Sequence, residues 1–188
     1  MKIPGPVILI GFKGSGKTVV GRALAAKLGL EYSDTDAIIE GLHEILKDEP
    51  LNCREIYKKY GAEYFKKLEM EAVREAFESS YAVISLGGGT LMNMEESGAV
   101  LKKGIMVHLS VEKETLFSRI MKNGIPAFFD PTDPRNSFEK YYEDRTPVYR
   151  RHAEITVDNT DRPIDGVVNE IVAALKNKTG GGAVSMAS

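Results

Sequence analysis

A short run at residues 11–18 holds three glycines, a lysine and a threonine at a spacing suited to binding phosphate. The run reads Gly-Phe-Lys-Gly-Ser-Gly-Lys-Thr, which fits the Walker A pattern Gly-x-x-x-x-Gly-Lys-Ser/Thr. Glycines let successive backbone amides turn inward and donate to phosphate oxygens. Lys17 is expected to bridge the β- and γ-phosphates, and the Thr18 hydroxyl to ligate Mg²⁺. The run therefore predicts binding of ATP with Mg²⁺. The predicted ATP contacts are Gly14, Ser15, Gly16, Lys17, Thr18 and Val19.

The sequence on either side of this phosphate loop supports the same interpretation. Apolar residues 7–10 predict a buried strand directly before it, and amphipathic residues 17–28 predict a helix that opens at Lys17. A helix N-terminus directs its positive end toward a bound phosphate. The alternative is a glycine-rich turn with an incidental Lys-Thr pair, which the strand-loop-helix context disfavours. The loop predicts a nucleotide and leaves the acceptor open.

Two carboxylates, Asp34 and Asp36, follow the second predicted strand at residues 30–33. Ligands gather at the carboxyl ends of strands in open α/β sheets, so both side chains are expected to face the crevice of the phosphate loop. One carboxylate can hold Mg²⁺ through water, and the other can accept the proton of an attacking hydroxyl. For either residue alone, the alternative is an N-cap of the next helix.

Three successive glycines, Gly87, Gly88 and Gly89, follow the buried run at residues 82–86. Glycines forfeit side-chain contacts and carry an entropy cost, so the run predicts close approach between the backbone and a ligand. A tight turn is the alternative, although it usually needs fewer glycines.

These motifs need a scaffold in which strand ends converge. Apolar β-rich runs alternate with longer amphipathic stretches, which predicts a parallel sheet. Because the strand runs are nearly continuously apolar, helices are expected on both faces. The predicted fold class is α/β, a three-layer sandwich around a parallel sheet of about five strands. The expected strands are residues 7–10, 30–33, 82–86, 105–109 and 154–157, and the expected helices are residues 17–28, 63–79, 112–122, 137–151 and 163–176.

Chain length favours a single domain. The 188 residues, 43% of them hydrophobic, suffice for one sizeable core. We expect residues 1–178 to form one domain built on the phosphate loop. Within it, the charged, helix-rich segment 41–61 is expected to bind substrate, and the Pro- and Phe-rich loop 123–136 to act as a lid. Residues 179–188 lack periodicity and are predicted to be disordered.

The composition indicates which classes of partner and which compartment to expect. The net charge is −2 with basic residues scattered among acidic ones, so no basic stripe predicts a nucleic acid or membrane partner. A small-molecule substrate fits better, and a monomer is expected. The single cysteine, Cys53, cannot form an internal disulfide, which favours a reducing, cytoplasmic compartment. Its thiol is expected to pack in or beside a helix.

Four motifs together resemble the shikimate kinase family. They are the phosphate loop, Asp34-Thr35-Asp36, Leu86-Gly87-Gly88-Gly89, and residues 144–151, which read Asp-Arg-Thr-Pro-Val-Tyr-Arg-Arg. Their order and rough spacing match the family over about residues 7–175. The resemblance implies the P-loop fold of nucleoside monophosphate kinases. It also implies transfer of the γ-phosphoryl group of ATP to a ring hydroxyl of shikimate, in the route to chorismate and the aromatic amino acids.

The resemblance also implies roles for residues on the acceptor side. Asp36 is expected to contact shikimate hydroxyls and to act as the base, and Asp34 to support Mg²⁺. Gly88, with its two neighbouring glycines, is expected to contact the ring. Arg145 is expected to bind the carboxylate, which a guanidinium fork suits chemically. Without the resemblance, a solvated surface arginine is an equal alternative for Arg145.

Two further arginines are assigned to the nucleotide by the same resemblance. Arg119 is expected to stack on the adenine, and Arg162 belongs to the loop expected to close over it. Taken as single residues, Arg119 could equally be solvated and Arg162 could cap or solvate the start of the last helix.

Three departures from the family fall in the substrate and lid regions. Lys66, in Phe-Lys-Lys-Leu-Glu, stands where the family has a second carboxylate-binding arginine, and lysine cannot bind in the same bidentate way. Ile125 stands where the family has a lid arginine, which removes a cation expected near the transferred phosphoryl group. Lys122 or Arg135 is the expected substitute. A longer segment at residues 42–54 replaces the family's Thr-Gly-x-Ser-Ile stretch.

Three hypotheses follow for the function. The first is a shikimate kinase that binds ATP and Mg²⁺, with Lys17 and Asp36 as catalytic residues and with Asp36, Lys66 and Arg145 on the substrate. The second keeps the fold and chemistry but changes the acceptor to another hydroxylated acid, such as gluconate. The third is a non-catalytic nucleotide-binding paralogue.

Overall fold

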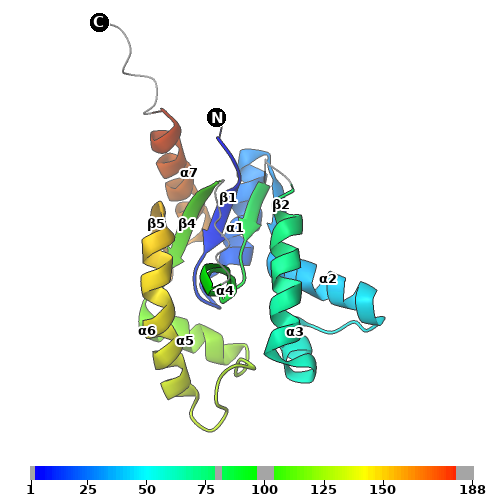
Figure 1. The fold of residues 1–188 in the computed structure, drawn as a ribbon. Helices are drawn as coiled ribbons and strands as arrows, with labels where there is room; N and C mark the ends of the chain where they lie inside the picture. The colour runs from blue at the N-terminus through cyan, green and yellow to red at the C-terminus, as the bar shows by residue number, and fades with distance from the viewer. Residues whose placement is uncertain (1–2, 79–81, 97–103, 181–188) are drawn as a thin grey trace, which may run out of the picture.

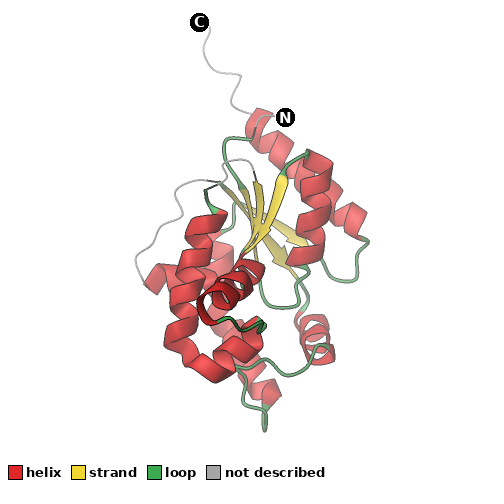
Figure 2. Ribbon diagram, turned by 90° about the vertical axis from the view of Figure 1, so that its right-hand side faces the viewer, coloured by secondary structure: helices red, strands yellow, loops and turns green. Residues whose placement is uncertain are grey.

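The fold is a five-stranded parallel sheet with helices on both faces (Figures 1 and 2). The computed structural model describes residues 3–78, 82–96 and 104–180. The strand order is β2-β3-β1-β4-β5, and every neighbouring pair is parallel. The predicted α/β class is thus confirmed. The strands are β1 Val7–Ile10, β2 Glu31–Asp34, β3 Ala82–Ser85, β4 Ile105–Ser110 and β5 Ile155–Asp158. The helices are α1 Lys17–Leu28, α2 Thr35–Lys47, α3 Cys53–Ala76, α4 Thr90–Glu96, α5 Lys113–Lys122, α6 Pro134–His152 and α7 Ile164–Gly180.

Alternate residues of the central strand β1 face two apolar layers. Val7 and Leu9 belong to the layer shared with α1 and α7, whereas Ile8 and Ile10 belong to the layer shared with α3, α4, α5 and α6. This alternation is the period of two that a strand imposes on its side chains. All four side chains are buried, so apolar side chains pack against β1 from both faces of the sheet.

The edge strand β2 differs from the prediction. Its residues, Glu-Tyr-Ser-Asp, are exposed or half-buried, because an edge strand has a neighbouring strand on one side only. β2 is therefore not the nearly continuous apolar run that was expected of the strands. Tyr32 of this strand packs against α1 at Gly21, where an added Cβ would lie 2.5 Å from the tyrosine ring.

The segment 41–61 forms most of α2 and the start of α3, as its predicted helix content required. Ile39, Ile56, Leu68 and Ala72 form a separate apolar cluster between these helices. Gly61 interrupts α3 with a φ of +80°, a conformation that glycine adopts readily. The long part of α3 therefore begins close to the predicted boundary at residue 63. Ser79, the last residue of that predicted helix, lies outside the described residues.

Several boundaries differ from the predictions. The predicted lid loop ends at residue 133, since Asp133 accepts from the amide of Asn136 at 3.1 Å and caps α6 there. The helix α4 was missed because the glycine run before it masks any apolar period. Disorder from residue 179 is wrong for residues 179–180, which belong to α7. Residues 181–188 lie outside the described part.

Candidate active site

The predicted functional motifs meet at the carboxyl ends of three neighbouring strands. β1 runs into the phosphate loop, β2 ends at Asp34, and β3 runs into Gly87. In the strand order, the chain after β1 leads to β2 on one side of the sheet, whereas the chain after β3 leads to β4 on the other side. This is the position at which open α/β sheets bind their ligands.

The phosphate loop contains glycine where its backbone turns. Gly14 and Gly16 have φ values of +85° and +92°, and the amide of Ser15 donates to the carbonyl of Phe12 at 3.1 Å. Asn159, after β5, holds the loop from one side, because its Nδ2 donates to the carbonyl of Ser15 at 2.8 Å. A Cβ on Gly16 would lie 2.5 Å from that nitrogen. Asn159 was not predicted from the sequence, although it lies in the same loop as Arg162.

The ammonium of Lys17 is held by carbonyls of its own loop. Nζ donates to Gly11 and Phe12 at 2.8 and 3.0 Å. Burial lowers the pKa of Lys17 to about 8, while the charges of Asp36 and Asp34 act in the opposite direction. The loop lysine and the two predicted carboxylates are therefore close enough to interact.

Thr18 and Asp34 form an oxygen pair that suits Mg²⁺. The Thr18 hydroxyl donates to Asp34 Oδ2 at 2.9 Å, and the Tyr32 hydroxyl donates to the same oxygen at 2.8 Å. Mg²⁺ at kinase sites takes one or two carboxylates and completes its shell with water and phosphate oxygens, so this donor set fits the ion. Asp34 also caps α2, since Oδ1 accepts from the amide of Asp36 at 3.1 Å. Capping and metal support are thus compatible in one side chain.

Asp36 lies in the first turn of α2, beside Gly87. A Cβ on Gly87 would lie 2.7 Å from Asp36 Oδ1, so glycine permits this approach. Thr35 Oγ1 joins the two segments, because it accepts from the amide of Gly87 at 2.9 Å and donates to the carbonyl of Ser85 at 3.3 Å. Burial among protein atoms, followed by the charge of Asp34, raises the pKa of Asp36 to about 6. The side chain still opens onto solvent, and such a pKa suits a proton acceptor near neutral pH.

Arg145 of α6 approaches the same glycine turn. Its Nη1 donates to the carbonyl of Gly88 at 3.3 Å, and a Cβ on Gly89 would lie 3.7 Å from its Nη2. The charge of Arg145 also lowers the pKa of Lys17. Asp36 and Arg145 therefore border one turn beside the phosphate loop, although they come from different elements.

Three aromatic rings orient the guanidinium of Arg145. Its central carbon lies 5.5 Å from the ring centre of Phe12, 5.0 Å from Phe128 and 4.7 Å from Tyr141. Cation–π contacts of this kind favour a fixed position for the charge. The phosphate loop, the predicted lid and α6 thus each contribute one ring.

Two buried side chains, neither of them predicted from the sequence, fix the glycine turn and the start of α4. The Tyr149 hydroxyl donates to the carbonyl of Gly88. Glu69 accepts from the hydroxyl of Thr90 at 2.6 Å and from the side-chain amide of Asn93. Tyr149 and Glu69 are 2% and 3% exposed. They stand inside motifs singled out for other residues.

Lys66 forms an ion pair with a residue outside the site, Glu96. Its Nζ lies 2.9 Å from Glu96 Oε2, and its side chain is 38% exposed. In the part of the chain that the structure describes, no hydrogen bond or ion pair joins Lys66 to Asp36 or Arg145. Its contact with a substrate stays a prediction.

Arg119 and Arg162 both border the loop after β5. Arg119 donates to the carbonyl of Asn159 at 3.1 Å, and Arg162 donates to the carbonyl of Asp158 at 2.9 Å. Because Asn159 also holds the phosphate loop, both arginines lie near that loop. Val19 is 53% exposed in the first turn of α1. The contacts of these three residues with ATP stay predictions.

The two cations expected to replace the lid arginine differ in whether they form ion pairs. Arg135 pairs with Glu114 and with Glu139, at 2.5 and 2.9 Å. Lys122 forms no ion pair within residues 3–78, 82–96 and 104–180. Ile125 packs against the apolar layer.

Arg54 is a third cation near the lid, and it was not predicted from the sequence. A Cβ on Gly124, at the start of the lid loop, would lie 3.2 Å from Arg54 Nη1. The preceding residue, Cys53, donates through Sγ to the carbonyl of Asp36 at 3.3 Å. Arg54 makes no hydrogen bond or ion pair with any described residue. Arg54 therefore lies between the start of α2, which carries Asp36, and the lid loop.

Comparisons with known proteins agree on one family. The sequence model described as shikimate kinase matches residues 13–176. A shikimate kinase from Thermus thermophilus is 37% identical over 179 residues, which cover 93% of this chain and 94% of that protein. One from Caldanaerobacter subterraneus is 33% identical over 168 residues, or 89% of this chain and 94% of that protein.

Solved structures support the fold. The structure of shikimate kinase from Acinetobacter baumannii in complex with shikimate has a TM-score of 0.81 and 23% sequence identity, and the match covers 96% of each chain. The family match and the curated relatives, both of which span most of the sequence, confirm the resemblance carried by the four motifs. This chain belongs to the shikimate kinase family.

Proposed function

We propose that this chain transfers the γ-phosphoryl group of ATP to a ring hydroxyl of shikimate, in the route to chorismate and the aromatic amino acids. Beside its family membership, one observation carries the proposal. Asp36 and Arg145, an acceptor for a hydroxyl proton and a cation for a carboxylate, border one glycine turn next to Lys17.

On the nucleotide side, the amides of residues 14–18 bind the phosphates, and Lys17 exchanges its loop carbonyls for phosphate oxygens. Arg119 and Arg162 flank the adenine, and Val19 contacts the nucleotide from α1. Thr18 and Asp34 hold Mg²⁺, which neutralises phosphate charge when bound. The oxygen pair that these two residues form supports this assignment.

On the acceptor side, Asp36 orients the shikimate hydroxyl and takes its proton. The hydroxyl oxygen forms a bond to the γ-phosphorus as the bond to the bridging oxygen breaks, and ADP leaves. Gly87, Gly88 and Gly89 allow the ring to approach the backbone. Arg145 binds the carboxylate, and Lys66 joins it on release from Glu96.

The segments 41–61 and 123–136 act as the substrate-binding part and the lid of a single domain. Arg54 supplies the cation absent at Ile125. It belongs to the first segment and reaches the second at Gly124, it forms no ion pair with a described residue, and a guanidinium suits a transferring phosphoryl group. Lid closure also excludes water and limits hydrolysis of ATP.

The proposal extends to the compartment, the oligomeric state and the partners of the enzyme. We infer a cytoplasmic monomer whose ligands are small molecules and not nucleic acids or membranes. None of the described helices meets the length and apolarity needed to cross a bilayer.

Release of ADP on a panel of hydroxy acids tests the proposal. We expect shikimate to stimulate release strongly and gluconate to give only the background rate, with Lys17→Ala as the inactive control. Stimulation by gluconate and not by shikimate would support the second hypothesis. ATP binding without turnover on any acceptor would identify a non-catalytic paralogue.

A further inference from the structure

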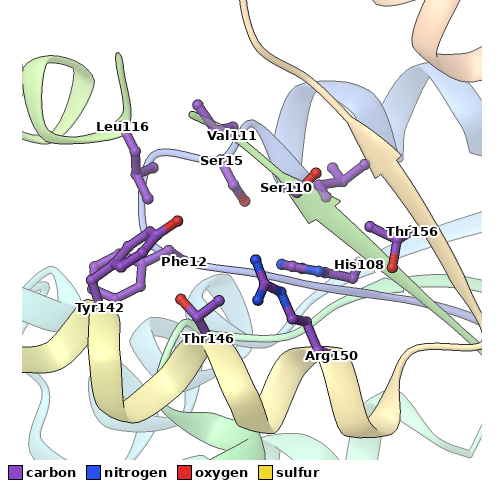
Figure 3. Close-up of a pocket in the computed structure, with 11 residues that line it drawn as sticks. Phe12, Ser15, His108, Ser110, Val111, Leu116, Tyr142, Thr146, Arg150 and Thr156 are labelled. Atoms are coloured by element: carbon purple, nitrogen blue, oxygen red, sulfur yellow. The ribbon is translucent and has the colours of Figure 1, made fainter. Parts of the chain in front are cut away.

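A cavity of about 140 Å³ lies behind the phosphate loop. Its lining includes Phe12 and Ser15 of the loop, His108 of β4, and Thr146 and Arg150 of α6. Figure 3 shows the guanidinium of Arg150 rising from α6 into the space between Ser15 and the His108 ring. We call this space the rear cavity.

Two aromatic residues separate the rear cavity from the site proposed for shikimate. The Phe12 ring lines the cavity and also contacts Arg145. Tyr149 stacks on His108 with ring centres 5.4 Å apart, while its hydroxyl donates to the carbonyl of Gly88. The rear cavity is therefore a separate space that shares a wall with the acceptor site.

Two buried polar groups that line the rear cavity have no protein partners. Ser15 is 1% and His108 is 5% exposed, yet the Ser15 hydroxyl and Nδ1 of His108 lack hydrogen bonds. Buried polar atoms are nearly always paired, since an unmade hydrogen bond costs the full desolvation of the group. Arg150 is exposed, and it makes no hydrogen bond or ion pair with any described residue. Three groups thus lack partners around one space.

The described side chains that line the rear cavity include the cationic Arg150 and no anionic group. Burial, then the positive charges of Arg150 and Lys17, lowers the pKa of His108 to about 4. The imidazole is therefore neutral at neutral pH and offers one N–H donor. A guanidinium, a hydroxyl and an imidazole N–H are groups that bind an oxyanion.

We propose that the rear cavity binds a small inorganic oxyanion of the phosphate or sulfate class. Arg150 supplies the charge, and the hydroxyl of Ser15 and the ring of His108 donate to the anion oxygens. Water would satisfy the two buried groups, whereas an oxyanion also brings a negative charge to the guanidinium of Arg150. Because Ser15 belongs to the phosphate loop, the anion also contacts the back of the nucleotide site.

Sulfate binding to the nucleotide-loaded protein tests the proposal. The phosphate loop itself attracts sulfate, so it is first saturated with the magnesium complex of a non-hydrolysable ATP analogue, and its occupancy is verified by calorimetry. Sulfate is then titrated at constant ionic strength in a bulky organic buffer. We expect one saturable site in the wild type. Arg150→Gln removes a charge-assisted contact and should weaken binding about tenfold or more.

Arg151→Gln is the matched control. Arg151 is the next residue on α6 but pairs with Glu95 at 2.7 Å, so its loss should leave sulfate affinity unchanged. The chain has three histidines, so His108→Phe identifies the His108 imidazole resonances, which should shift on titration. The absence of a saturable site, equal affinity in Arg150→Gln, or unshifted His108 resonances would each overturn the proposal and indicate a cavity filled by water.

Discussion

The guanidinium of Arg145 lies 5.0 Å from the ring centre of Phe128. One side chain belongs to α6 and the other to the predicted lid, so the proposed carboxylate-binding group and the lid are in contact. We expect movement of the lid to change the position of Arg145, and binding of a carboxylate at Arg145 to change the position of the lid.

Removing the ring of Phe128 should weaken shikimate binding. A cation–π contact contributes about 0.5–2 kcal/mol, so Phe128→Ala should raise the KM for shikimate by roughly 2- to 30-fold. The KM for ATP should change little. Phe128→Tyr retains the ring and serves as the control. An unchanged KM for shikimate in Phe128→Ala would show that Arg145 is positioned without the lid.

The pH dependence of the reaction should report Asp36. As a base, Asp36 must be ionised, and its pKa is raised to about 6 by burial and by the charge of Asp34. The value of kcat/KM should therefore fall as the pH drops through about 6, where the carboxylate takes up a proton. Measurements of kcat/KM for shikimate between about pH 5 and pH 8 locate this limb.

Asp36→Asn should lower kcat by about 10²- to 10⁴-fold, and its residual activity should lose the acid limb. Asp48→Asn, at the exposed far end of α2, is the control and should retain both. An acid limb that persists unchanged in Asp36→Asn would assign the proton acceptor to another group.

The glycine turn offers a matched pair of substitutions. A Cβ on Gly87 would lie 2.7 Å from both Asp36 Oδ1 and Thr90 Oγ1, whereas a Cβ on Gly89 meets its nearest atom at 3.7 Å, on Arg145. Overpacking costs about 1–3 kcal/mol, so Gly87→Ala should lower kcat/KM for shikimate by roughly 5- to 150-fold. Gly89→Ala should have a much smaller effect. Equal losses in the two variants would argue against a specific clash with Asp36.

Three substitutions separate the candidates for the lid cation. Arg54→Ala should lower kcat on the order of 10²-fold, because a donor to developing charge acts in the transition state. Arg54→Lys should restore part of the loss. Lys122→Ala and Arg135→Ala should remain close to wild type. A large loss of kcat in Lys122→Ala, with Arg54→Ala unaffected, would transfer the role to Lys122.

The dependence on Mg²⁺ should follow Asp34. Chelation with EDTA should abolish ADP release, and Asp34→Asn should raise the Mg²⁺ concentration for half-maximal rate by roughly 10- to 100-fold. Tyr32→Phe removes a donor to the same Asp34 oxygen and should have a smaller effect. Asp34→Asn with an unchanged Mg²⁺ requirement would limit Asp34 to capping α2.

The geometry of the phosphate loop was predictable from the sequence because it depends on contiguous residues. The loop from Gly11 to Thr18 includes its own glycines, its lysine and the predicted metal ligand, and β1 and α1 have the predicted bounds. The carboxylates of Asp34 and Asp36 were also predictable, since the end of a strand determines the edge of the sheet at which they lie.

The remaining site residues depend on contacts between distant segments. Asn159 reaches Ser15 across 144 positions, and Tyr149 reaches Gly88 across 61. No local period or spacing marks such pairs. Arg54 lies in a charged segment whose pattern indicates only a helix, and the pairing of Lys66 depends on α4, which was not predicted.

Tyr149 has one further consequence, because its hydroxyl and its ring serve different neighbours. A compound lodged against the His108 face of that ring would press on the glycine turn while leaving both substrates free to bind. Inhibition of this kind would not be relieved by raising the concentration of ATP or of the acceptor, which distinguishes it from competition at the cleft.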